Sequence, residues 1–158
     1  MRILASALLC LAALSGNALA GDVAIYGGQF SSFRDNKDKT SMVGAEYRFA
    51  DQFNGLRPTV GAFVNNDSAA YGYAGAYWDL PLNTAPFVIS PGFAVGGYHQ
   101  GDSKDLGLGL EFRSTMEVTY KMQNGQRIGA QISHLSNASL GDENPGVETL
   151  QVVYSHPF

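Results

Sequence analysis

Polar and apolar side chains alternate along most of the chain, and no segment shows a convincing helical period. The alternation is clearest between Asp105 and Lys121. One set of alternate positions there is apolar and consists of Leu106, Leu108, Leu110, Phe112, Met116, Val118 and Tyr120. The other set carries the charged residues Asp105, Glu111, Arg113, Glu117 and Lys121. Because successive side chains of a β-strand point to opposite sides, the pattern predicts a strand with one apolar and one charged face.

Eight extended stretches of this kind follow one another, separated by turn-forming residues. We predict strands at residues 22–30, 40–49, 56–65, 69–79, 85–98, 105–121, 126–136 and 147–157. The breaks contain Asn54-Gly55, Asn124-Gly125 and Asn144-Pro145-Gly146, residue types that favour turns. The 19 glycines and the high aromatic content suit closely spaced strands better than helices.

Two architectures fit eight alternating strands. In a soluble barrel of the lipocalin kind the apolar faces point inward, whereas in a membrane barrel they meet lipid and the interior is polar. The stretch from Asp105 to Lys121 exceeds both the roughly 5–6 residues of a globular strand and the roughly 9–11 that cross a bilayer. The terminal Phe158, which follows an alternating strand, favours the same choice. We therefore predict an all-β fold, an eight-stranded antiparallel transmembrane β-barrel of the outer membrane, with the soluble barrel as the alternative.

The first twenty residues have the features of a secretory signal peptide. Arg2 supplies the positive start, an apolar run follows, and Ala18-Leu19-Ala20 offers small residues at the cleavage positions. A membrane anchor is the alternative, but the apolar run is shorter than the roughly 20 residues of a spanning helix. We predict a signal peptide at residues 1–20 and a single barrel domain at residues 21–158.

Composition excludes several kinds of chemistry in residues 21–158. The one cysteine, Cys10, lies within the predicted signal peptide, so thiol catalysis, disulfides and cysteine metal sites are excluded from the barrel. The formal net charge of the full chain is −4, and no extended basic stretch is present to bind nucleic acid.

Polar residues interrupt the predicted lipid-facing surface near the end of the chain. In the seventh stretch the even-numbered positions are Ile128, Ala130, Ile132, His134 and Ser136. The even-numbered face of the last stretch is also apolar, and it begins with Glu148. A hairpin around residues 137–146, which we place on the outer side of the membrane, brings Glu148 opposite His134.

These residue types are those of a serine esterase. An imidazole activates a serine hydroxyl by taking its proton, and a carboxylate orients the imidazole. His134 and Ser136 lie two residues apart on one side of a strand, with Cα atoms about 7 Å apart. Asn137 follows and could donate its amide to a developing oxyanion. The plainer interpretation is that these polar residues mark where two strands leave the membrane, and residues alone do not separate the two interpretations.

The motif His134-Leu135-Ser136-Asn137-Ala138, followed by Gly146-Val147-Glu148 and a closing alternating strand, resembles the lipid A 3-O-deacylases of the PagL type. The resemblance implies an outer-membrane barrel with His134 as base, Ser136 as nucleophile, Glu148 as orienting acid and Asn137 as oxyanion donor. Ser139 stands where a glycine is expected. Residues 1–125 carry no motif of this specificity.

The same resemblance implies the reaction and its partners. The reaction is hydrolysis of the 3-position ester of lipid A, the lipid anchor of lipopolysaccharide, in the outer leaflet, with release of a 3-hydroxy fatty acid. It requires no metal or organic cofactor, and the resemblance also allows for a homodimer. A non-enzymatic barrel with a structural or adhesion role is the alternative function. We expect His99 to be a solvated loop residue and His156 to be an interfacial anchor.

Overall fold

The computed structural model describes residues 20–31, 33 and 39–158. Residues 1–19 of the predicted signal peptide lie outside this range, so that assignment stays a prediction. The strands are β1 (Gly21–Phe30), β2 (Thr40–Phe49), β3 (Leu56–Asn65), β4 (Ala70–Trp78), β5 (Leu80–Pro81), β6 (Phe87–His99), β7 (Leu110–Lys121), β8 (Arg127–Ser136) and β9 (Val147–Pro157). Within the described part of the chain, no helix is long and apolar enough to cross a membrane.

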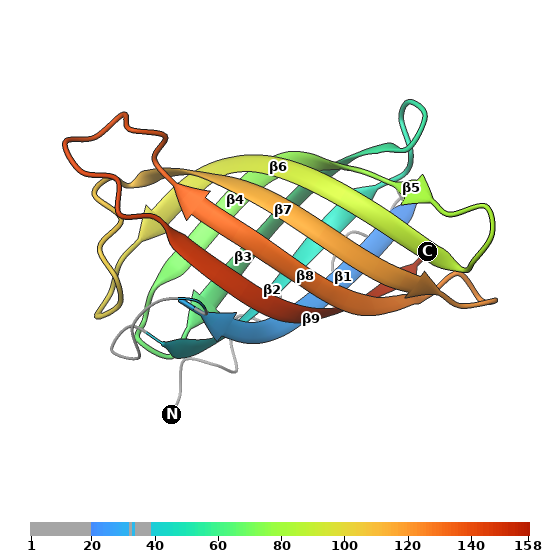
Figure 1. Cartoon of the computed structure of the whole chain (residues 1–158), viewed down its shortest axis with the longest axis horizontal. Coiled ribbons are helices and arrows are strands. Elements are labelled where there is room, and N and C mark those ends of the chain that lie inside the picture. Colours follow the sequence, from blue (N-terminus) through green and yellow to red (C-terminus); the bar gives the residue numbers. More distant parts are fainter. Residues whose placement is uncertain (1–19, 32, 34–38) are drawn as a thin grey trace.

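The strands close into a barrel in which neighbours run antiparallel. β1 pairs with both β2 and β9, and β4 pairs with β6, so the sheet has no free edge between its long strands. The two-residue β5 only extends the pairing of β6. Figure 1 shows the long connections gathered at one end of the barrel and the short turns, with the C-terminus, at the other. We call these the loop end and the turn end. The predicted all-β fold with eight long antiparallel strands is confirmed.

The sixth predicted stretch is shorter than its alternation indicated. We expected a strand from Asp105, but β7 begins at Leu110 and residues 100–109 form a loop. Gly107 has a left-handed φ of 84°, and its N–H donates to Asp105 Oδ1 at 2.8 Å. This local turn breaks the strand and folds Leu106 inward, where it is 1% exposed instead of facing outward. The assignment of residues 105–109 to a strand was therefore wrong.

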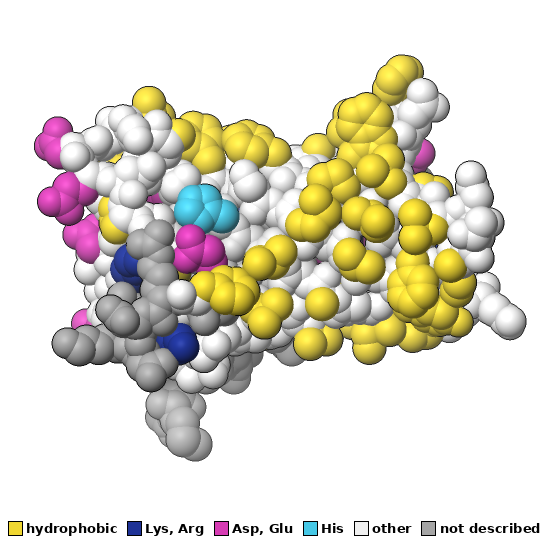
Figure 2. Space-filling model, in the orientation of Figure 1, with side chains coloured by type: hydrophobic (Ala, Val, Ile, Leu, Met, Phe, Trp, Pro, Cys, Tyr) yellow, Lys and Arg dark blue, Asp and Glu magenta, His cyan; other side chains and the backbone are white. Residues whose placement is uncertain are grey.

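Apolar side chains cover the outside of the barrel. Figure 2 shows them spread over the middle of the barrel and its turn end, with acidic residues concentrated at the loop end. Exposed apolar residues on β7, β8 and β9 include Leu110, Met116, Val118, Ile128, Ile132, Leu150 and Val152. A continuous apolar exterior around a closed sheet is the arrangement of a membrane barrel, because lipid replaces water at that surface.

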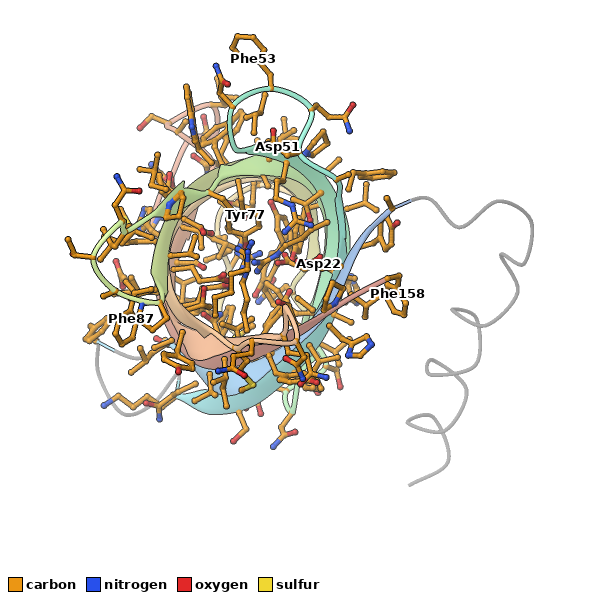
Figure 3. The ribbon with its side chains drawn as sticks, turned by 90° about the vertical axis from the view of Figure 1, so that its right-hand side faces the viewer. Asp22, Asp51, Phe53, Tyr77, Phe87 and Phe158 are labelled. Carbon is orange, nitrogen blue, oxygen red and sulfur yellow. The ribbon has the colours of Figure 1, made fainter. Side chains whose placement is uncertain are left out.

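The interior is filled by charged and hydroxyl side chains, and a network of ion pairs and hydrogen bonds lies at its centre. Arg48 donates from both terminal nitrogens to Glu117, at 2.7 and 2.6 Å, and its Nε donates to Glu46 at 2.6 Å. The hydroxyl of Tyr73 donates to Glu46 at 2.5 Å. All of these side chains are buried. Figure 3 shows side chains, Tyr77 among them, filling the space inside the ribbon, while Phe87 and Phe158 point away from it.

Toward the loop end the interior becomes apolar. Phe30, Phe63 and Tyr71 pack ring against ring, with centroids 6.0 and 5.5 Å apart. Leu135 on β8 and Val147 on β9 belong to the same buried cluster and are both 0% exposed. These two residues face inward beside the outward-facing His134 and Glu148, so that part of the barrel wall lies on a packed core.

Replacing Arg48 with alanine tests the interior network. The change leaves Glu46 and Glu117 buried without their main counter-charge, which typically costs about 3–5 kcal/mol for a buried ion pair. We expect urea unfolding in detergent, followed by tryptophan fluorescence, to show a loss of this order. Val43→Ala on the lipid-facing surface is the control and should change stability little. Equal effects of the two variants would contradict a structural role for the network.

Candidate active site

His134 and Glu148 face each other across β8 and β9. Their Cα atoms are partners in the antiparallel ladder, and His134 Nδ1 lies 3.2 Å from Glu148 Oε1. Both side chains point out of the barrel, with 47% of the His134 side chain and 25% of the Glu148 side chain exposed. The predicted hairpin register is thus confirmed. Figure 2 shows a histidine in contact with an acidic side chain on the outer surface, over the loop ends of β8 and β9.

Ser136 is the last residue of β8 and lies two positions beyond His134. Leu135 between them is fully buried in the core, so Ser136 shares the outward face of His134. Because Nδ1 of His134 faces the carboxylate, Nε2 is the ring nitrogen left to serve a neighbouring hydroxyl. The structure therefore brings His134, Ser136 and Glu148 to one small area of the outer surface.

The residues on β7 complete the surroundings. Ser114 is the Cα partner of His134, and Phe112 is the partner of Ser136. The Phe112 ring stacks on Phe93 of β6, with centroids 5.9 Å apart and planes inclined by 21°. Ser136 thus has an aromatic surface on its β7 side. Sequence reasoning missed both β7 residues, because their distance along the chain hides the register that aligns them with β8.

Apolar pairs continue the outward face of β8 and β9 toward the turn end. Ile132 pairs with Leu150, Ala130 with Val152 and Ile128 with Tyr154. Among these, Ile132, Leu150, Val152 and Ile128 are at least 40% exposed. The polar site therefore lies at one end of an apolar strip long enough to contact hydrocarbon along two strands.

Asn137 does not have the arrangement that we expected. Its side-chain amide was predicted to be an oxyanion donor, but Nδ2 donates to the carbonyls of Leu106, at 3.0 Å, and Glu143, at 2.7 Å. An amide group has two hydrogens, and both are used. Its backbone N–H donates to Asn144 Oδ1 at 3.1 Å, and the side chain is 0% exposed. In this structure Asn137 ties the loops at 100–109 and 137–146 together.

The backbone after Ser136 is in an unusual conformation. Ala138 and Ser139 have left-handed φ angles of 53° and 62°. The N–H of Ser139 donates to Asn137 Oδ1 at 3.0 Å, and that of Leu140 to the Asn137 carbonyl at 3.0 Å. For residues other than glycine, left-handed φ angles cost roughly 1–2 kcal/mol each, so the Asn137 contacts must hold this turn in place.

The remaining histidines lie outside the site. His156 is on β9 near the turn end, where Nδ1 is 3.0 Å from Gln126 Nε2 and the ring meets Phe158 edge-on. His99 ends β6 at the loop end and is exposed. Among the residues that the structure describes, no group of three His, Cys, Asp or Glu side chains is placed to hold a metal ion.

A hollow of about 680 Å³ opens at the turn end, at the opposite end of the barrel from His134, Ser136 and Glu148. Arg57, Asp79 and Arg127 are among its lining residues. Arg57 pairs with Asp22 at 2.7 Å, and Arg127 pairs with Asp79 at 2.6 Å. These charged side chains at the turn end thus pair with one another. Its charges belong to the barrel structure.

Known proteins resemble this chain both in structure and in sequence, and the structural likeness concerns the fold. By structure, the chain resembles a crystal structure of the outer membrane enzyme PagL, with a TM-score of 0.65 and 20% identity over 87% of this chain and 99% of that one. It also resembles Neisserial surface protein A, with a TM-score of 0.62 and 14% identity over 88% of this chain and 96% of that one. At these identities the likeness shows the shared barrel fold alone.

Sequence comparison is more specific. The curated lipid A deacylase PagL of Pseudomonas aeruginosa is 36% identical over 65 residues, which are 41% of this chain and 37% of the relative. The corresponding protein of Bordetella bronchiseptica is 31% identical over 55 residues, 35% of this chain and 31% of the relative. The alignments therefore span about a third of each relative's length. The sequence model of the lipid A 3-O-deacylase (PagL) family matches residues 47–157, the greater part of the chain, and the chain belongs to this family.

Proposed function

We propose that this protein is an outer-membrane esterase that hydrolyses the 3-position acyl ester of lipid A. The observation that carries the proposal is the contact between His134 and Glu148 beside Ser136, on the outer surface of a family member's barrel. The named relatives are lipid A deacylases. The position of the cleaved ester and the roles of the three residues are the finer parts of the proposal.

In the first half of the reaction, Ser136 Oγ attacks the ester carbonyl carbon while His134 Nε2 takes the hydroxyl proton. The carboxylate of Glu148, next to Nδ1, stabilises the imidazolium that forms. The tetrahedral intermediate then collapses. The bond to the sugar oxygen breaks, and His134 returns the proton to that oxygen. The acyl group remains on Ser136 as an ester, and the deacylated sugar leaves.

In the second half, water replaces the sugar. His134 Nε2 takes a proton from water as its oxygen attacks the acyl-serine carbonyl, and then returns the proton to Ser136 Oγ. The products are a free 3-hydroxy fatty acid and the regenerated serine. All of these steps use side chains of the protein and water.

The position of the site suits a lipid substrate. Three polar side chains lie at the loop end of the outward face, and the apolar strip from Ile132 to Tyr154 extends from them along β8 and β9. With the loop end toward the outside of the cell, an acyl chain of lipid A can lie along this strip while its ester reaches Ser136 at headgroup depth. The substrate is then cleaved without leaving the bilayer.

Localisation follows from the same reasoning. A closed barrel with an apolar exterior can span a bilayer, because all backbone groups of its strands are paired. The family to which the chain belongs indicates the outer membrane. We propose residues 1–20 as the signal peptide that directs export. Association into a homodimer remains an expectation of the resemblance.

Replacing Ser136 with alanine tests the nucleophile. We expect the release of 3-hydroxy fatty acid from lipid A to fall to background, measured by mass spectrometry of lipid A incubated with the purified barrel. Ser133→Ala is the matched control, because Ser133 lies on the same strand but faces the interior. That variant should keep most of its activity. Full activity in Ser136→Ala would contradict the assignment of Ser136 as the nucleophile. Unchanged lipid A with the wild-type protein would favour the non-enzymatic barrel.

Replacing Glu148 with glutamine tests the orienting acid. The amide keeps the size of the side chain but loses the charge that stabilises the imidazolium. Loss of the acid in comparable triads lowers kcat by about 10⁴-fold, and we expect a loss of up to about this size with little change in KM. Steady-state kinetics in detergent micelles provide the measurement. A variant within about twofold of the wild-type kcat would show that Glu148 is not part of the mechanism.

Replacing Asn137 with aspartate separates its two roles. The change removes both N–H donors to Leu106 and Glu143, so we expect faster hydrogen–deuterium exchange in the loops at 100–109 and 137–146. The turn at residues 122–126 serves as the internal control. If activity falls while exchange in both loops is unchanged, the tethering role is contradicted and the oxyanion role predicted from the sequence is favoured.

A further inference from the structure

We infer that Gly146 is a positioning residue: the absence of a side chain at this position leaves the space that the His134 ring occupies. This inference rests on the proposed function. Gly146 ends the loop at 137–146 and directly precedes β9. Since Val147 pairs with Leu135, Gly146 is level with Ser136 in the ladder. It therefore lies on the β9 side of Ser136, opposite the aromatic surface that Phe112 provides on β7.

The space beside Gly146 is occupied by the imidazole. A Cβ added at position 146 would lie 2.9 Å from His134 Cε1 and 3.4 Å from His134 Nε2. It would also lie 3.3 Å from the carbonyl oxygen of Leu135, a backbone atom held in the β8–β9 ladder. Carbon atoms in good contact are about 3.5–4.0 Å apart. A Cβ at position 146 would therefore displace the ring, because on its other side it would meet the backbone of β8.

The edge of the ring that meets Gly146 is the edge that the reaction uses. Nδ1 is committed to Glu148, so Nε2 must exchange protons with Ser136 and the substrate. The Nδ1–Oε1 distance of 3.2 Å is already at the long end of N–H···O hydrogen bonds. A shift of a few tenths of an ångström would weaken this contact and misdirect Nε2 at the same time.

A second requirement for glycine comes from the backbone. Gly146 has a φ of 56°, in the left-handed region where side chains with a Cβ are disfavoured. Turn geometry alone would therefore explain a glycine here. In the sequence, Gly146 belongs both to the turn signal Asn144-Pro145-Gly146 and to the motif Gly146-Val147-Glu148, and neither indicates a contact with the His134 ring. The ring contact is the additional claim, and it is separable from the backbone requirement by the choice of substitution.

The test uses three variants of the full barrel in detergent. Gly146→Ala adds a Cβ and backbone strain. Gly146→Asn adds a Cβ with less strain, because asparagine tolerates left-handed φ best among the larger residues. Gly125→Ala is the matched control: Gly125 has a φ of 84°, lies at the turn end, and an added Cβ would meet only Pro157 Cγ at 3.1 Å.

Three readouts separate positioning from folding. Heat-modifiable migration on gels reports the folded fraction, kinetics with lipid A report kcat and KM, and a fluorophosphonate probe reports the activation of Ser136 without lipid A. A misplacement of about 1 Å can cost about 10²-fold in rate. We expect folded Gly146→Ala and Gly146→Asn to lose about 10–100-fold in kcat and in labelling rate, with KM within about threefold. Gly125→Ala should match the wild-type protein.

The outcomes are distinguishable from those of the proposed function. If the probe labels Ser136 of the wild-type protein but lipid A stays intact, the proposed substrate is wrong. The labelling rates of the variants still test whether Gly146 positions the His134 ring. The positioning role of Gly146 is contradicted if folded Gly146→Asn has the labelling rate and kcat of the wild-type protein. Backbone strain alone would then account for the glycine. The positioning role is also contradicted if neither Gly146 variant folds, because the residue would then serve the turn, or if the wild-type serine is not labelled.

Discussion

The structure depends on one constraint: inside hydrocarbon, every backbone N–H and C=O must find a partner within the protein. The pairing of β1 with β9 meets this requirement by closing the sheet. Closure also fixes which side of each strand faces outward. On β8, Gln131 and Ser133 point into the barrel and are nearly fully buried, so Ile132 and His134 between and beyond them must point out. The candidate site is a consequence of this alternation.

Charged side chains on the inner and outer faces of the barrel wall are stabilised in different ways. In the interior, Arg48 is surrounded by Glu46 and Glu117, so that no charge of this group is buried alone. On the exterior, His134 and Glu148 are partly exposed and lie at the loop end, where headgroups and water are within reach. The core beneath them, with Leu135 and Val147 fully buried, holds both strands rigid. A site on such a wall is preorganised, because paired strands above a packed core fix the positions of the side chains that they carry.

Much of this arrangement could be predicted from residues alone, because period-two alternation is a local signal. The limits of most strands, the outward face of β8 and the pairing of His134 with Glu148 all follow from it. The turn at Gly107 could not be predicted, since its residues continue the alternation by chance and only tertiary packing draws Leu106 inward.

The loop contacts were also beyond reach from sequence. Asn137 hydrogen-bonds to carbonyls 31 and 6 residues away, and nothing in its neighbourhood in the sequence indicates those partners. The contact of Gly146 with the His134 ring is of the same kind. A turn signal shows that the chain can bend at a glycine, but it does not show what occupies the space that the missing Cβ leaves.

The central claim is that strand parity places Ser136 and its partners on the lipid-facing surface. Because residues 21–158 contain no cysteine, single cysteines can be introduced and spin-labelled along β8 and in β9. Collision of each label with oxygen, which concentrates in lipid, reports its side by electron paramagnetic resonance in bilayers. The account predicts high oxygen contact at positions 132, 134, 136, 148 and 150, and immobile, shielded labels at 133, 135 and 149. The opposite phase, or no alternation, would contradict it.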